Sequence, residues 1–476
     1  MQTVELDTVD PVIEDGPRSS TRPTLVAWSS SSRIVTQPTG SALGQQQKQG
    51  NLRSRCLSSS SLGPILALSL MMILLAVTAV VIATHIVTGA PPLTIPDAAW
   101  YGTAPLSVSL PPSDQPLTFF AHGSCADQAK PQHFWNTVQS VQPQLFIFNG
   151  DIVYGDCASA ASCDDLPLAW RDLFNNANFQ SASATLPMMG ILDDHDYGKN
   201  DCDASWEGKG YAKSIFLERF NISADDIRRS RDGLYRSQTF GPAGQRVQII
   251  LLDTRWFRSP FVASDCTDWR VEDCAGRERY VAYPEADADQ YTILGAEQWA
   301  WLRAVLLEPA ELRVMVSTIQ VLATGHGWER WGLIPTETRK LVTLIRETHA
   351  NGVVLLSGDR HTGGIYKLGK GASGSEGDVP YDLFEVTSSS LSHSFRTDET
   401  EPATRRIGNL THYNNFGTLS VDWQARKLKL DLRASDDCGL STQHWHQVCE
   451  APGSGVPGSV LMETTVSLDA LVVDPE

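Results

Sequence analysis

The chain has 476 residues, of which 42% are hydrophobic and 8% aromatic, and its formal net charge is −17. This composition excludes a wholly disordered, collagen-like or many-pass membrane protein, because each of these has a much more skewed residue usage. The acidity also argues against nucleic-acid binding, which relies on clustered Lys and Arg. A bound cation could offset part of the negative charge.

Residues 1–61 are polar, with few periodic apolar positions, as in the stretches RSSTRPTLVAWSSSSR and TGSALGQQQKQG. Such a sequence cannot bury enough apolar surface to offset the entropy lost when the backbone is ordered. We therefore expect a disordered tail.

Residues 62–87 form an almost wholly apolar segment, and no Asp, Glu, Lys or Arg occurs between Arg55 and Asp97. A helix that spans a bilayer needs about 20 apolar residues, so we expect one transmembrane helix that acts as a signal anchor. A buried core helix of this length would normally have a polar face. A cleaved signal peptide would lie at the extreme N-terminus.

The flanks of this segment predict its orientation. Arg53 and Arg55 precede it, and the next basic residue after it is Lys130. By the positive-inside tendency, the N-terminus is cytoplasmic and the large C-terminal part is extracellular or lumenal. We therefore expect a single-pass membrane protein.

The cysteines agree with this orientation, since eight of the nine follow the apolar segment. An even number suits disulfides in an oxidising compartment. Close spacing favours the pairs Cys157–Cys163, Cys266–Cys274 and Cys438–Cys449. The tripeptides that begin at Asn221 and Asn409 match the glycosylation pattern, which gives weak further support.

Composition also divides the remaining chain. Residues 88–116 are rich in Pro, Ser and Thr and predict an extended stalk. Residues 117–433 predict a globular domain. Residues 434–476, with two cysteines and several Gly and Ser residues, predict an irregular C-terminal extension.

Six short apolar runs in the globular part each end in polar residues, namely LTFFA, QLFIFN, LPMMGIL, VQIILLD, LRVMVSTIQVLAT and GVVLLS. Such runs are typical of buried strands. Helical patterns lie between several of them, namely PQHFWNTVQSV, EQWAWLRAVLLE and PTETRKLVTLIRETHA. The alternation predicts an α/β fold with a largely parallel sheet, whose ligands bind beyond the C-terminal ends of the strands.

The residues after these runs carry carboxylate, imidazole, thiol and phenol groups. They are Asp151, Asp156, Asp193, Asp194, Asp196, Asp253, Asp359, His122, His195, His326, His361, Cys125 and Tyr154. Carboxylates this crowded would repel one another unless a cation lies among them. Oxygen, nitrogen and sulfur ligands together suit iron, zinc, manganese or calcium.

Each of these residues also has an ordinary structural interpretation. An Asp after a strand is often a turn former or helix cap, and Cys125 could be half of a disulfide. The prediction of a metal site therefore depends on the whole set. A pair of metal ions can activate water and hold phosphoryl oxygens, and Asp151, directly after Gly150, could bridge two ions.

In chain order, the motifs GSC, GDIVYGD, DDHDYGKND, LDTR and SGDRH resemble those of the PhoD-like branch of the calcineurin-like metallophosphoesterases, the alkaline phosphatase D family. The resemblance covers about residues 118–433. It implies an α/β/β/α sandwich of two mixed sheets, with two or more metal ions at one edge. Iron and calcium are suggested by the family, while zinc or manganese are also compatible.

The resemblance implies a metal-binding role for six residues. Asp151 resembles the bridging ligand, and Asp194, Asp359 and His361 resemble further ligands. Cys125 and Tyr154 resemble ligands of a ferric ion.

Other residues resemble catalytic or substrate-binding groups. His195 occupies the position expected to stabilise the transition state or protonate the leaving group. Arg255 is a candidate phosphate contact, with a structural salt bridge as an equal alternative. His326 is a candidate metal ligand or substrate contact. Arg360, a departure from the family motif, could alter substrate preference.

We therefore expect a membrane-anchored phosphatase that hydrolyses phosphomonoesters by attack of metal-bound hydroxide. Phosphodiesters are a further candidate substrate class. The alternatives are a phosphodiesterase for lipid headgroups or nucleotides, and a non-catalytic, membrane-displayed binding protein with the same fold. The presence of both Asp151 and His195 argues against loss of catalysis.

Overall fold

The computed structural model describes residues 103–265, 279–372, 378–394, 401–435 and 456–474. The expected tail, the expected transmembrane helix at 62–87 and the proposed pairs Cys266–Cys274 and Cys438–Cys449 lie outside these ranges. Within these ranges, no helix is both long enough and apolar enough to cross a bilayer.

The first sheet has six strands in the order β15-β14-β13-β1-β2-β3. Their bounds are β1 Phe119–Gly123, β2 Phe146–Asn149, β3 Met188–Ile191, β13 Asn415–Asp422, β14 Lys427–Ala434 and β15 Val460–Ser467. β1, β2 and β3 are parallel, whereas β13, β14 and β15 are antiparallel to their neighbours. Helix α2 (Phe134–Ser140) connects β1 to β2, and α3 (Asp165–Asn175) and α4 (Ala177–Ser183) connect β2 to β3.

The second sheet has seven strands in the order β12-β10-β11-β9-β8-β5-β4. Their bounds are β4 Arg236–Phe240, β5 Val247–Leu251, β8 Leu312–Val316, β9 Val353–Ser357, β10 Gly363–Leu368, β11 Leu383–Ser388 and β12 Arg406–Thr411. β5, β8, β9 and β11 are parallel. Helices α7 (Gly295–Leu306) and α8 (Pro335–Glu347) make the crossovers from β5 to β8 and from β8 to β9.

The smaller elements lie in the connections. They are the helices α5 Asp194–Tyr197 and α6 Lys209–Arg219, the paired strands β6 Val262–Ala263 and β7 Tyr280–Val281, and the 3-10 helices Ile227–Arg229, Ala288–Gln290, Trp331–Leu333 and Leu468–Ala470. Of these, α5 follows β3 directly and carries part of the predicted site.

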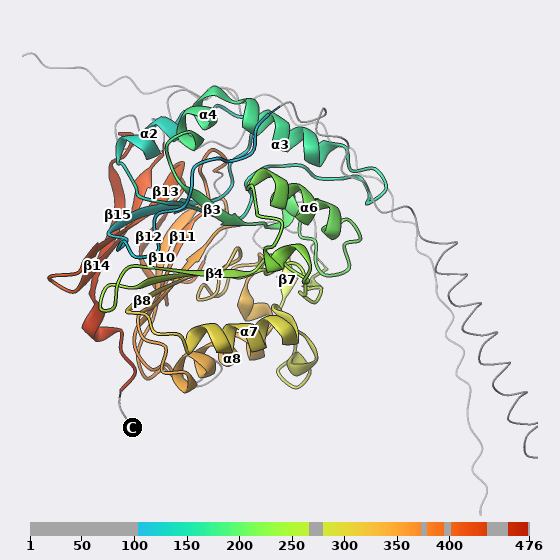
Figure 1. Cartoon of the computed structure of the whole chain (residues 1–476). Helices are drawn as coiled ribbons and strands as arrows, with labels where there is room; N and C mark the ends of the chain where they lie inside the picture. The colour runs from blue at the N-terminus through green and yellow to red at the C-terminus, as the bar shows by residue number, and fades with distance from the viewer. Residues whose placement is uncertain (1–102, 266–278, 373–377, 395–400, 436–455, 475–476) are drawn as a thin grey trace, which may run out of the picture. The chain divides into compact units, whose positions relative to one another are not determined.

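Helices cover the outer faces of the two sheets. Figure 1 shows α2, α3 and α4 over the first sheet and α7 and α8 beyond the second. On α2, the Trp135 ring packs edge-on against Phe146 and Phe148, with centroid distances of 5.1 and 5.7 Å. Side chains alternate along a strand, so Ile147 points to the opposite face of the sheet. The two mixed sheets and their flanking helices agree with the predicted sandwich.

The six apolar runs are confirmed as strands, because they form β1, β2, β3, β5, β8 and β9. The three helical patterns are confirmed as α2, α7 and α8. The strands are wholly or largely buried, as their continuous apolar character indicates.

The prediction of an irregular extension over residues 434–476 is wrong for residues 460–467. These residues form β15, which pairs antiparallel with β14 along its whole length. Its β-branched residues suit a strand, and pairing satisfies the backbone groups that the edge of β14 would otherwise expose. The Gly- and Ser-rich sequence before β15 made this strand difficult to recognise.

The predicted stalk also ends earlier than residue 116. The Thr103 hydroxyl accepts a hydrogen bond from Arg219 Nη1 at 2.9 Å, and the Leu106 N–H donates to the Arg219 carbonyl oxygen at 2.9 Å. Leu106 and Leu110 pack against the hydrophobic core. Tertiary contacts therefore fix residues 103–116 on the domain despite their linker-like composition.

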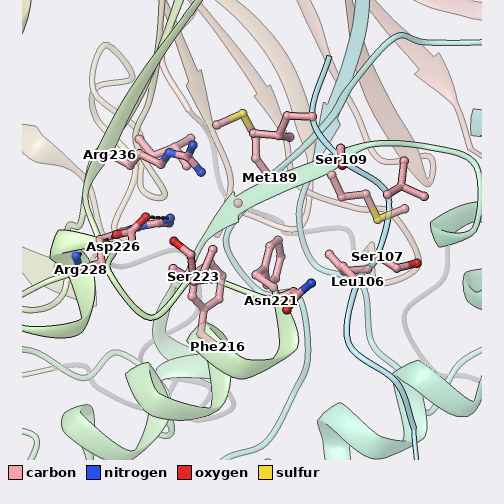
Figure 2. A pocket seen from close by; sticks show the side chains of 17 residues that line it. Leu106, Ser107, Ser109, Met189, Phe216, Asn221, Ser223, Asp226, Arg228 and Arg236 are labelled. Atoms are coloured by element: carbon pink, nitrogen blue, oxygen red, sulfur yellow. Dashed lines mark hydrogen bonds and ion pairs between the residues drawn. The ribbon is translucent and has the colours of Figure 1, made fainter. Parts of the chain in front are cut away.

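This segment forms one wall of a cavity of about 290 Å³. In Figure 2, Leu106, Ser107 and Ser109 lie across the cavity from the Asp226–Arg228 ion pair and Arg236. The cavity lies beside β3 and α6 and is not lined by any of the candidate site residues.

Candidate metal centre

Three loops that follow parallel strands adopt left-handed backbone conformations at candidate site residues. The φ angles are 59° at Cys125, 46° at Asp151, 69° at Asp359 and 53° at His361. Residues other than glycine rarely adopt such angles, which occur in turns and are also concentrated at functional sites. The loops after β1, β2 and β9 therefore share a left-handed conformation at candidate site residues.

The first group of ligand atoms joins these three loops. Cys125 Sγ lies 3.3 Å from Asp151 Oδ2, and the Tyr154 hydroxyl lies 3.4 Å from the same oxygen. Tyr154 also lies 3.4 Å from His361 Nε2. Cys125, Asp151 and His361 each offer an atom within 4.8 Å of the other two. A thiol, a carboxylate, an imidazole and a phenol thus converge on one point.

Neighbouring groups orient this first group. His361 Nδ1 lies 2.6 Å from the carbonyl oxygen of His393, so an Nδ1–H donates there and leaves Nε2 facing Tyr154. Ser389 Oγ lies 3.1 Å from Cys125 Sγ and accepts a hydrogen bond from the His361 N–H at 2.8 Å. Such supporting contacts are typical of metal ligands.

A second group of ligand atoms adjoins the first. Asp151, Asp194 and His195 offer atoms within 4.8 Å of one another, as do Asp193, Asp194 and Asp359. Asp151 belongs to both the thiol-containing group and the carboxylate-rich group, which is the arrangement expected of a bridging ligand. The described residues therefore bring Cys125 and the predicted carboxylates together at one end of the sandwich.

The carboxylates of this centre fit bound cations. Burial, and then the charges of Asp194 and Asp193, raise the pKa of Asp151 well above its ordinary value. Burial and the Glu329 carboxylate do the same to the pKa of Asp359. Within the described residues, Asp151 Oδ1 and Asp193 Oδ2 are buried without a hydrogen-bond partner. Cations would supply the missing partners and neutralise the crowded charges.

The two groups offer different ligand chemistry. The thiol and imidazole of the first suit a transition metal such as iron or zinc. The oxygen-rich second group suits a harder cation such as calcium or manganese. The donor atoms of both groups thus fit bound metal ions.

His195 lies at the edge of the second group, and its ring contacts a carboxylate. Its Nδ1 lies 2.7 Å from Asp156 Oδ2, and its ring centroid lies 4.2 Å from that of Tyr154. Burial lowers the pKa of His195, but the carboxylates of Asp194 and Asp156 outweigh burial and raise the pKa to about 10. An imidazole held protonated in this way can donate a proton to a leaving group.

Arg255 is placed as a structural ion pair and not as an exposed phosphate contact. Its side chain is 0% exposed, with Nε 2.5 Å from Asp193 Oδ1 and Nη1 2.7 Å from Glu329 Oε2. Nη2 lies 3.5 Å from Asp359 Oδ1. The structure therefore favours the salt-bridge alternative, because the side chain is buried and Nε and Nη1 are paired with carboxylates. Nη2 has no hydrogen-bond partner among the described residues and lies nearest to Asp359 and Asp194.

His326 lies outside these groups of potential ligands that the structure describes. Its Nδ1 accepts a hydrogen bond from the Trp328 N–H at 3.2 Å. Burial, together with the charges of Arg360 and Arg330, lowers its pKa well below the ordinary value. Arg360 itself is 4% exposed and lies 3.9 Å from Glu401, so its charge is directed into the domain.

Two of the carboxylates that the sequence analysis placed after strands have structural roles. Asp196 accepts hydrogen bonds from the N–H groups of Asp193 and Ile152 and thereby ties the loop after β3 to the loop after β2. Asp253 accepts from the N–H groups of Arg255 and Trp256 and forms the turn after β5. The turn-former interpretation of an Asp after a strand is correct for Asp253.

Sequence reasoning missed Asp201, Glu329 and Ser389. Asp201 and Glu329 lie within 4.8 Å of Asp194. They are also paired with Arg279 and Arg258, at 2.5 and 2.8 Å. Asp201 ends the DDHDYGKND motif, so the motif itself was a signal for this residue. Glu329 and Ser389 lie in stretches without a distinctive pattern.

Among the described cysteines, the predicted Cys157–Cys163 pair is confirmed, whereas Cys202 has no disulfide partner there. Cys157 and Cys163 form a disulfide. Cys125 and Cys202 are free and buried, so Cys125 retains a thiol that can bind metal.

Comparisons with known proteins agree with this geometry. A sequence model described as PhoD-like phosphatase matches residues 120–432. A solved structure described as "Structure of PhoD" is similar, with a TM-score of 0.54 and 18% identity over 78% of this chain and 72% of that chain. Another, described as "GAP50 the anchor in the inner membrane complex of Plasmodium", has a TM-score of 0.41 and 10% identity over 75% and 90% of the two chains. No curated protein matches the chain.

Proposed function

Because the chain belongs to the PhoD-like phosphatase family, we propose that it is a metal-dependent phosphoric ester hydrolase that acts on phosphomonoesters. The observation that carries the proposal is the convergence of Cys125, Asp151, Asp194, Asp359 and His361 from separate strands. When bound at such a centre, metal ions polarise phosphoryl oxygens and lower the pKa of coordinated water.

The chain's own residues would perform the remaining tasks. Asp151 would hold two cations at a short separation, since it belongs to both groups of ligand atoms. His195 would donate a proton to the leaving oxygen, supported by Asp156 at 2.7 Å. Arg255 would hold the Asp193 and Asp359 carboxylates in position through its ion pairs with them.

The proposal is tested by purifying the full-length protein, measuring its metal content, and assaying p-nitrophenyl phosphate and bis-p-nitrophenyl phosphate before and after chelation. We expect hydrolysis of the monoester that is lost on chelation and lost in Asp151→Asn. Activity on the diester alone would instead favour the phosphodiesterase alternative. Metal binding without hydrolysis of either ester would favour the non-catalytic alternative, and equal rates with Asp151→Asn would remove the mechanism.

We further propose that residues 62–87 anchor the protein in a membrane, with the catalytic domain extracellular or lumenal. The apolar segment and the preceding arginines support this arrangement. The Cys157–Cys163 disulfide is compatible with an oxidising compartment. Carbonate extraction and protease protection of intact vesicles test it: release into the soluble fraction, or digestion from the cytoplasmic side, would contradict it.

The two glycosylation tripeptides offer a separate test of the same orientation. Asn221 and Asn409 are both exposed on the domain. A lumenal domain should therefore lose mass on endoglycosidase treatment, and the loss should be smaller in Asn221→Gln. A cytoplasmic domain should show no change.

A further inference from the structure

A phosphate ester brings negative charge to the centre, and the arginines nearest to the ligand carboxylates are not free to receive it. Arg255 has no exposed surface and contacts Asp193 and Glu329. Arg360 is turned into the domain toward Glu401. Neither arginine therefore presents an exposed guanidinium to the substrate.

The turn formed by residues 127–130 lies directly beside the thiol-containing group. The Lys130 N–H donates to the Asp127 carbonyl oxygen at 3.1 Å and closes the turn. Gln128 fixes it against the site, because its side-chain amide donates to the Tyr154 carbonyl oxygen at 2.9 Å and accepts from the Tyr154 N–H at 2.8 Å. The Ala126 N–H also donates to the carbonyl oxygen of Asp151, at 3.0 Å.

The Lys130 side chain is held near the centre with a weak partner. It is 15% exposed, and its Nζ lies 3.8 Å from Asp127 Oδ2, near the upper limit for an ion pair. The turn that carries it is hydrogen-bonded to the backbone of Tyr154 and Asp151, which places Lys130 beside the thiol-containing group. Burial lowers the pKa of Lys130. A largely buried ammonium group with one distant carboxylate would gain from a second, closer anion.

We propose that Lys130 donates to a non-bridging oxygen of the substrate phosphate and thereby favours phosphomonoesters over phosphodiesters. This inference depends on the proposed hydrolase function. A phosphomonoester, whose second pKa is about 6, carries nearly two negative charges above neutral pH. A phosphodiester carries one, because a second substituent occupies the oxygen that would bear the other. A lysine at this position therefore contributes more to binding of the monoester.

The test compares the wild-type holoenzyme with Lys130→Met, which keeps the chain length and removes the charge, and with Lys130→Arg, which keeps the charge. Lys427→Met is the remote control. Lys427 pairs with Asp422 at the end of β13 opposite to Asn415, whose N–H donates to the carbonyl oxygen of Ser390, next to Ser389. Lys199→Met is the local competitor, since Lys199 is exposed and its N–H bonds the Asp194 carbonyl oxygen. Metal content and thermal unfolding are measured for every variant.

In Lys130→Met we expect kcat/KM for p-nitrophenyl phosphate to fall about tenfold and inorganic phosphate to bind about tenfold more weakly, equivalent to about 1.4 kcal/mol. The rate on bis-p-nitrophenyl phosphate should fall by only about threefold, because that substrate carries one charge and therefore loses about half of this interaction. Lys130→Arg should restore most of the monoester rate. Metal content should match the wild type in all four variants.

Equal losses on both esters, or unchanged phosphate affinity, would overturn the role of Lys130. A selective loss of monoester activity in Lys199→Met alone would assign the contact to the loop after β3 and also reject the proposal. If the wild type hydrolyses neither ester, the proposed function fails, but phosphate affinity measured by calorimetry still tests the Lys130 contact.

Discussion

His195 Nδ1 lies 2.7 Å from Asp156 Oδ2, although the two residues follow different strands. Asp156 is anchored from the other side, because its Oδ1 accepts the Asn200 N–H at 2.7 Å. The carboxylate therefore fixes the imidazole ring and favours its protonated form, as an orienting carboxylate does in other proton-transfer sites. This pair makes Asp156 a positioning residue for the proposed acid.

Asp156→Asn should move the alkaline limb of the pH profile of kcat/KM to lower pH. The Asp156 carboxylate raises the pKa of His195, so its removal lowers that pKa, and the ring loses its proton at a lower pH. We expect a shift of about one pH unit, since an opposite charge within hydrogen-bonding distance typically shifts a pKa by about one to three units. Asp172→Asn, which removes an exposed partner of Arg171, serves as the control. An unchanged alkaline limb would argue that His195 is not the acid.

Ser389→Ala should weaken metal binding without altering any ligand. Ser389 contacts Cys125 Sγ and accepts from the His361 N–H, so it orients two members of the first group. Loss of such a supporting contact typically costs about 10- to 100-fold in metal affinity. Metal content after dialysis against a weak chelator measures the effect. Ser390→Ala is a matched control, because Ser390 Oγ has no hydrogen-bond partner within the described residues; equal metal loss in both variants would contradict the assigned role.

Arg255→Met should destabilise the fold more than it changes substrate affinity. The substitution leaves Asp193 buried without its ion-pair partner, and it leaves Glu329 with Arg258 alone. Breaking a buried ion pair on one side costs about 3–5 kcal/mol, which urea unfolding measures. Arg303→Met, which removes an exposed pair with Glu347, should cost at most about 1 kcal/mol. A large rise in KM with unchanged stability would return Arg255 to the role of a phosphate contact.

Chelation of the holoenzyme should lower the melting temperature as well as the activity. Without cations, the raised pKa values of Asp151 and Asp359 mean that these carboxylates become protonated or repel one another. Binding to the folded state alone at 100 times Kd adds about 2.7 kcal/mol of stability, so the loss should be visible by calorimetry. Restoring individual metals identifies which cation recovers stability and which recovers activity. A melting temperature that does not respond to chelation would contradict a metal centre at these residues.

The strands that carry the site were predictable from local sequence patterns. Continuous apolar runs predicted β1, β2, β3, β5, β8 and β9, because a strand buried on both faces has no polar alternation. The ordered motifs after these runs predicted the site residues from Cys125 to His361. Local composition failed where tertiary contacts decide the structure, at residues 103–116 and in β15.

The contacts of each polar group at the site follow from the three-dimensional fold and not from local sequence. The LDTR motif is equally compatible with a phosphate contact and an ion pair. The carboxylates around Arg255 identify its role as an ion pair. Glu329 and Lys130 have no local pattern that relates them to the centre, because their positions depend on how distant loops pack. Hydrophobic periodicity is a local property of the chain, whereas charge pairing depends on distances that folding alone establishes.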